Sequence, residues 1–291
     1  MDKRKSWIDE SLLSAPSFSW LLLFFLIPSL IVFFYAFKPT DSYGNVEEGW
    51  TLQSIQTLVH PSNLILIWRT CWLSVITTLI CLLLALPVGY QLATCSKKWR
   101  KWLLLLIVVP FWTSFLIRIF AWKQVLHPEG ILKQFLVSIG ILEPTSTLLY
   151  NSGAVLLVMV YTYLPFAVFP IYSSASKFNF QLVEAAMDLG ASFFQAFFKV
   201  FVPGIRAGII TGMVMVFISA LGAYVIPDLV GGIGSEMIGN KIAQRTFLER
   251  NLPEASALSL LVIFALFIPI VIVRRFSSHF KKIEAEARNR E

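Results

Sequence analysis

Long apolar stretches separated by short polar segments run through most of this 291-residue chain. Six of these stretches approach or exceed the length of about 20 residues that a helix needs to cross the hydrocarbon core of a bilayer. They cover approximately residues 18–37, 65–93, 102–125, 148–175, 205–230 and 257–273. The pattern predicts an all-α integral membrane protein with six transmembrane helices.

The composition excludes a soluble protein, because 57% of the residues are hydrophobic and only 14% are charged. We divide the chain into a polar N-terminal segment (1–17), a transmembrane domain (18–276) and a basic tail (277–291). A basic start before an apolar stretch can be a secretory signal. Here the stretch is long enough to span and no small-residue cleavage site follows it, so we expect an uncleaved first helix.

The positive charges are distributed unevenly among the polar segments. Two thirds of the 24 Lys and Arg residues lie in the N-terminal segment, the turn 96–101, the loop 177–206 and the residues after 273. Cytoplasmic segments of membrane proteins carry such an excess. Both termini and the loop 177–206 are therefore predicted to be cytoplasmic. The positive charges lie in alternate polar segments. We therefore interpret the net charge of +7 as a signal for the orientation of the chain in the membrane. We expect membrane lipid, and no nucleic acid, as a partner.

Sequence motifs of catalysis and metal binding are absent. No phosphate-binding Gly-x-x-x-x-Gly-Lys-Ser/Thr loop, His-Glu-x-x-His helix or Gly-x-Ser-x-Gly elbow occurs. The three cysteines, Cys71, Cys81 and Cys95, fall in or beside one apolar stretch without metal-ligand spacing. We expect no catalytic residue, no metal site and no cofactor bound by this chain. If it drives transport with ATP, another chain must hydrolyse the nucleotide.

The polar loop 177–206 is the most informative segment. Residues 184–189 are mostly helix formers, and Glu184 and Asp188 share one helical face. Gly190 then permits a sharp change of backbone direction. Five phenylalanines recur afterwards at helical spacing, which predicts a second short helix with an apolar face at the membrane surface. These are Phe193, Phe194, Phe197, Phe198 and Phe201.

This loop resembles the coupling loop of membrane permeases in bacterial ATP-binding-cassette importers. Glu184-Ala185-Ala186, then Gly190, then Val200-Phe201-Val202-Pro203 stand at the spacing of that signature, with Val in place of Ile and of Leu. The tripeptide alone could occur by chance in an ordinary loop. In the family the loop docks into a groove on a cytoplasmic ATPase, so the resemblance implies the type I importer permease fold. It also implies ATPase coupling by Glu184, Ala185, Ala186, Asp188, Leu189, Gly190, Ala191, Val200 and Pro203.

Polar and aromatic residues within the spans are candidates for a transport pathway, because such groups are expensive at membrane depth. Tyr224 and Asp228 stand four apart, and a ring beside a carboxylate suits an organic cation. Tyr161 and Tyr163 lie near the middle of the fourth stretch, and Trp112 lies midway along the third. The alternative is structural, since Tyr and Trp near span ends anchor at the interface and Asp228 could be solvated.

Three segments resemble spermidine/putrescine permeases, and the similarity covers nearly the whole chain. They are Val109–Lys123, Pro170–Ser174 and Tyr224–Gly232. The resemblance implies a polyamine importer in the bacterial cytoplasmic membrane. It also implies the partners: a second homologous permease, two ATPase subunits that use ATP and Mg²⁺, and an extracytoplasmic polyamine-binding protein.

Three alternatives stay open. The same machine could carry another small solute, such as an amino-acid derivative, thiamine or an inorganic ion. A stand-alone secondary transporter or channel would need carboxylates deep in the spans, where only the peripheral Asp228 is available. An intramembrane enzyme would need a reactive pair in the bilayer, and His60, His127 and His279 lie outside it.

Overall fold

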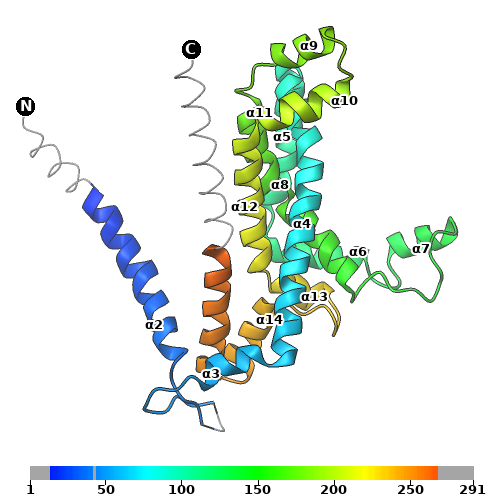
Figure 1. Ribbon diagram of the computed structural model, residues 1–291. Helices are drawn as coiled ribbons and strands as arrows, with labels where there is room; N and C mark the ends of the chain where they lie inside the picture. Colours follow the sequence, from blue (N-terminus) through cyan, green and yellow to red (C-terminus); the bar gives the residue numbers. More distant parts are fainter. Residues whose placement is uncertain (1–13, 42–43, 268–291) are drawn as a thin grey trace, which may run out of the picture. The chain divides into compact units, whose positions relative to one another are not determined.

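The computed structural model describes residues 14–41 and 44–267, and within these ranges regular structure is helical (Figure 1). The only strand-like pairing among these residues is an isolated bridge between Thr40 and Val46. The chain forms two compact units. Of the described residues, one unit comprises 14–41, 44–64 and 241–264, and the other comprises 65–240 and 265–267.

The first unit begins with an apolar helix, Ser14–Tyr35, which contains a π-helical turn, η1 (Leu22–Leu26), followed by α2 (Ile27–Tyr35). Two short helices follow, α3 (Gln53–Gln56) and η2 (Thr57–Val59). The unit also holds η4 (Gln244–Leu248) and most of the helix Leu252–Phe267, whose last residues, 265–267, belong to the second unit. Its small core consists of Ala36, Ala257 and Leu260.

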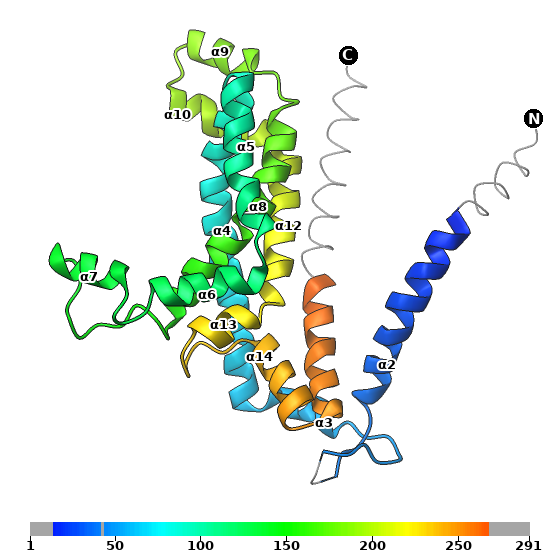
Figure 2. The same ribbon diagram turned by 180° about the vertical axis from the view of Figure 1, so that it is seen from behind.

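The second unit is built around three long helices, α4 (Pro61–Thr94, which begins in the first unit), α8 (Ser152–Ala175) and α12 (Arg206–Leu221). Both views show these helices side by side (Figures 1 and 2). The other helices are α5 (Lys97–Trp112), α6 (Phe115–Val125), α7 (Ile131–Ser138), α9 (Gln181–Asp188), α10 (Phe193–Ala196), η3 (Phe197–Phe201), α11 (Val202–Gly204), α13 (Val225–Val230) and α14 (Ile238–Ala243, which ends in the first unit).

Small residues bring α8 and α12 close together. A Cβ on Gly208 would lie 2.5 Å from the carbonyl oxygen of Pro170, and one on Gly212 would lie 3.2 Å from Cα of Ala167. In lipid, where no hydrophobic force drives helices together, such close backbone contact supplies the packing energy. The α8–α12 pair is therefore the rigid centre of the second unit.

Three predicted spans are single apolar helices: Ser14–Tyr35, Pro61–Thr94 and Ser152–Ala175. The first begins at Ser14, inside the segment expected to be a polar N-terminal extension. The sixth prediction is described only as Leu252–Phe267, and the rest of it lies outside the described residues with the tail 277–291. The described residues thus contain three helices that are long and apolar enough to cross a membrane, or up to five if each of two bent helix pairs counts as one span.

The third and fifth predicted spans are each broken rather than continuous helices. Helices α5 and α6 meet at 96°, because Thr113 and Ser114 adopt extended backbone between them. The Thr113 hydroxyl donates to the Pro110 carbonyl there, 2.7 Å away. Helix α12 ends at Leu221, and α13 is separate from it. Helix α12 also meets Phe193–Gly204 at 75°.

Candidate functional site

The loop 177–206 is ordered as two short helices joined at Gly190, as the sequence predicts. The side chain of Asn179 accepts a hydrogen bond from the Gln181 backbone N–H at the start of α9. At its end, the Gly190 N–H donates to the Met187 carbonyl and the Ala191 N–H donates to the Ala186 carbonyl. This bond pair is the Schellman motif, which ends a helix on a residue with positive φ.

Gly190 is required here for its backbone conformation. Its φ is +91°, and no atom lies within 4 Å of the position that a Cβ would take. A side chain would therefore have room, but the left-handed backbone would cost about 1–2 kcal/mol for a residue with a Cβ. The glycine sets the direction in which the chain leaves α9.

Helix α9 exposes most of its surface. Val183 is buried and Ala186 is half-buried, so these two residues attach the helix to the unit. Glu184, Ala185 and Asp188 are exposed, and the Leu189 side chain is 89% exposed. Exposed apolar side chains beside carboxylates are typical of a surface that another protein covers.

The second helix of the loop is held by an aromatic cluster. A capping box between Ser192 and Gln195 starts α10. The cluster surrounds Tyr90 of α4, whose ring centroid lies 5.0–5.7 Å from four phenylalanine rings, all in edge-on geometry. These rings belong to Phe180, Phe193, Phe197 and Phe201.

Tyr90 and Phe180 are site residues that the sequence analysis missed. Edge-to-face pairs contribute about 0.5–1.5 kcal/mol each beyond area burial. Because Tyr90 stands on α4 and its partners flank α9, these rings join the loop to the transmembrane helix. Beside the cluster, Gly204 lets Phe178 approach, since a Cβ on Gly204 would lie 2.2 Å from that ring. The loop is therefore packed against the second unit through its aromatic side, and α9 is its exposed part.

The remaining coupling residues predicted from the signature lie away from the exposed face of α9. Val200 is half-buried in η3 and packs on the core. Pro203 is exposed within α11. Both residues thus belong to the helical segment Phe193–Gly204 that follows Gly190. Pro203 stands next to Gly204, at the bend between this segment and α12.

The candidate pathway residues lie on three different helices, α5, α8 and α13. The Trp112 side chain is 78% exposed at the end of α5. Tyr161 is half-buried with its ring centroid 5.2 Å from that of Trp122, and Tyr163 is buried. Neither tyrosine forms a ring contact with Trp112 in the described part of the chain.

Tyr224 is the N-cap residue of α13 and Asp228 lies in the first turn of this helix, and both are exposed. The Asp228 N–H donates to the Tyr224 carbonyl at 3.0 Å, and the Asn240 side chain donates to the same carbonyl at 2.9 Å. Asn240 thus fixes the backbone that carries this pair. Among the described residues, no cluster of His, Cys, Asp and Glu could hold a metal ion.

Comparisons with known proteins agree with this architecture. The family described as "Binding-protein-dependent transport system inner membrane component" matches residues 82–282. The spermidine/putrescine transport system permease protein PotB of Haemophilus influenzae is 38% identical, over 92% of this chain and 94% of its own length. PotB of Escherichia coli K12 is 35% identical, over 92% and 98%.

A solved structure shares the fold. It is that of a bacterial alginate ABC transporter in complex with an alginate pentasaccharide-bound periplasmic protein. The similarity has a TM-score of 0.73 at 17% identity, and it covers 96% of both chains.

Proposed function

This chain belongs to the family of binding-protein-dependent transport system inner membrane components, and we propose that it carries polyamines, spermidine or putrescine, as a permease subunit of an ABC importer. It is a multi-pass inner-membrane protein, and the ATPase of such an importer is a separate chain. The observation that carries the proposed substrate is the similarity to two PotB permeases along 92% of the chain.

The exposed face of α9 is the proposed docking surface for the ATPase. Its apolar and acidic side chains, Leu189, Glu184 and Asp188, are all exposed. When the ATPase pair closes around ATP and Mg²⁺, α9 moves with it. The aromatic cluster around Tyr90 passes the movement to α4, and the bend between α11 and α12 passes it to the α8–α12 pair. The pathway then opens to the opposite side of the membrane.

The proposed complex contains a second homologous permease, two ATPase subunits and an extracytoplasmic polyamine-binding protein. The periplasmic protein bound in the alginate transporter structure supports the last of these. Both termini and α9 are placed in the cytoplasm, on the distribution of Lys and Arg. The side of the membrane opposite α9 then receives the substrate.

The proposed cation-binding residues at that entrance are Tyr224 and Asp228. The carboxylate of Asp228 is exposed and forms no ion pair within the described residues. It is thus available to an ammonium group, and the Tyr224 ring four residues earlier offers a face for cation–π contact. The aromatic residues Trp112, Tyr161 and Tyr163 are proposed to lie along the path beyond this entrance.

Reconstitution of the purified complex tests the proposal. An ATPase subunit should co-purify with the chain, and the proteoliposomes should import labelled spermidine or putrescine when ATP is enclosed on the α9 side. Excess unlabelled polyamine should compete, whereas thiamine, amino acids and inorganic cations should not. Uptake that only one of these other solutes inhibits would refute the polyamine assignment but leave the permease role intact.

A further inference from the structure

We infer that Ser74 and Thr77 of α4 form a hydrogen-bonding site for the ammonium groups of the transported organic cation, an inference that rests on the proposed function. Both side chains are completely buried, with 0% exposure. Neither hydroxyl has a hydrogen-bond partner among the residues that the structure describes. Because a buried hydroxyl without a partner costs free energy, two of them one turn apart indicate a ligand that bonds to them in another state of the transporter.

The two hydroxyls belong to a polar row on the buried face of α4. The row comprises the buried residues Thr70, Ser74, Thr77, Thr78 and Cys81. Their spacing of three and four residues places them on one side of the helix, over a rise of about 16 Å. Ser74 and Thr77 stand three apart, so their Cβ atoms are about 5–6 Å from each other. One ammonium group between them can therefore reach both oxygens.

The other two threonines of the row show what is unusual about Ser74 and Thr77. The hydroxyls of Thr70 and Thr78 donate to the backbone carbonyls four residues earlier, at 2.8 and 2.7 Å. Ser and Thr in helices often form this bond. The carbonyls four residues before Ser74 and Thr77 receive no such bond from these two hydroxyls. The missing bond is therefore a property of these two positions and is not shared by the whole row.

The row begins beside the proposed substrate entrance. The Thr70 hydroxyl accepts a hydrogen bond from the Ile238 backbone N–H at the start of α14, 2.9 Å away. Asn240 of the same helix donates to the Tyr224 carbonyl. Helix α14 thus connects the start of the row to the segment that carries Tyr224 and Asp228, and Figure 1 shows α13 and α14 near the beginning of α4. A cation that leaves the entrance meets this row next.

The row is closed against α8 in this structure. The Cys81 thiol donates to the Val160 carbonyl of α8, with the sulfur 3.6 Å from the oxygen. Both views show α4 and α8 side by side (Figures 1 and 2). Separation of α4 from α8 during transport exposes Ser74 and Thr77 to the substrate, and renewed closure releases it.

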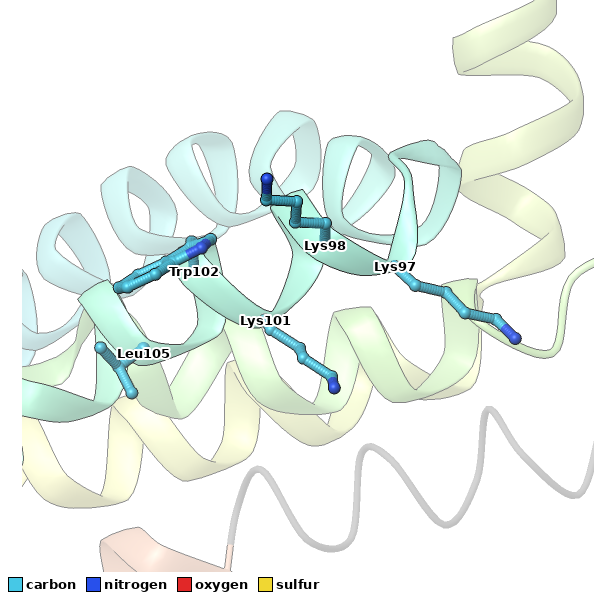
Figure 3. Close-up of a pocket in the computed structure, with 5 residues that line it drawn as sticks. All are labelled: Lys97, Lys98, Lys101, Trp102 and Leu105. Atoms are coloured by element: carbon cyan, nitrogen blue, oxygen red, sulfur yellow. The ribbon is translucent and has the colours of Figure 1, made fainter.

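The chemistry of the row favours an ammonium group. Such a group has only donors, and a hydroxyl oxygen accepts from it without holding it as firmly as a carboxylate would, which suits a pathway that must also release its substrate. The pocket on α5 has the opposite character, because the exposed side chains of Lys97, Lys98 and Lys101 line it (Figure 3). Three lysines repel an ammonium group, so that pocket is no alternative site.

Paired substitutions of Thr77 test the inference in the assembled transporter, reconstituted in proteoliposomes. T77V keeps the shape of the side chain but removes the hydroxyl, whereas T77S keeps the hydroxyl but removes a methyl group. The number of polyamine molecules imported per ATP hydrolysed should fall about tenfold in T77V, which loses a hydrogen bond to a charged group, and should stay within about twofold in T77S. A larger loss in T77S than in T77V would assign the side chain to packing and overturn the inference.

Thermal unfolding of the same complexes supplies the control. T77V should melt no lower than the unchanged protein, because it loses no hydrogen bond within the described chain. The matched variant T78V removes a hydroxyl of the same row that does donate to a carbonyl. It should lower the melting temperature and leave the import ratio unchanged.

The double variant S74A/T77V separates this inference from the proposed function. An unchanged import ratio in this variant, in a complex whose unchanged form imports spermidine, would overturn the inference and leave the proposed function intact. If the unchanged complex imported no polyamine, the proposed function would be refuted, and the ammonium site with it.

Discussion

Replacement of Tyr90 by Leu should uncouple ATP hydrolysis from uptake. Leu keeps most of the apolar volume but removes the ring that contacts Phe180, Phe193, Phe197 and Phe201. At the lower value of about 0.5 kcal/mol per aromatic pair, the four pairs contribute about 2 kcal/mol. A loss of that size lowers the equilibrium constant for packing of the loop against α4 by about thirtyfold.

The assay is the number of substrate molecules imported per ATP hydrolysed in proteoliposomes. The Y90L complex should assemble and hydrolyse ATP, because the exposed face of α9 is unchanged, but this ratio should fall at least tenfold. The matched control is Y90F, which keeps the ring and removes only the hydroxyl, and it should retain the ratio of the unchanged protein. A normal ratio in Y90L would refute the transmission of movement through Tyr90.

Three other substitutions address separate parts of the account. Glu184→Lys reverses a charge on the exposed face of α9 and should lower the amount of co-purified ATPase about tenfold, whereas Glu184→Gln should lower it less. Equal recovery of ATPase with both variants would show that Glu184 is not part of the docking surface. Gly190→Ala should reduce uptake, because the φ of +91° costs Ala about 1–2 kcal/mol. Gly190→Asn should reduce uptake less, because Asn tolerates that conformation better. A larger loss of uptake with Asn than with Ala would show that the backbone conformation of Gly190 is not the cause. Asp228→Asn should raise the KM for spermidine uptake about five- to tenfold through the lost charge, and an unchanged KM would take Asp228 out of the pathway.

The sequence predicts the long helices and the loop well because their signals are local. An uninterrupted apolar stretch suffices for α4 and α8, and helix formers followed by Gly190 suffice for the end of α9. The break between α5 and α6 is different. Neither Thr113 nor Ser114 is a Gly or Pro, and the extended backbone there depends on the surrounding packing.

The aromatic cluster could not be predicted for a similar reason. The periodic phenylalanines of the loop indicate a buried face, but their partner, Tyr90, lies about a hundred residues earlier in the chain. Nothing local marks that tyrosine among the apolar residues of α4. The pathway candidates rest on residue type and depth alone, and in the structure Tyr224 and Asp228 lie at the N-cap and in the first turn of α13.

Site-specific photo-cross-linking at position 189 tests the central claim most directly. A photoreactive residue in place of Leu189, in the assembled complex within membranes, should yield an adduct with the ATPase subunit. The same residue in place of Ile131 on α7, whose side chain is 86% exposed, should not. An adduct at position 131 and none at position 189 would contradict the account, as would labelling of position 189 by an impermeant reagent added outside the cell.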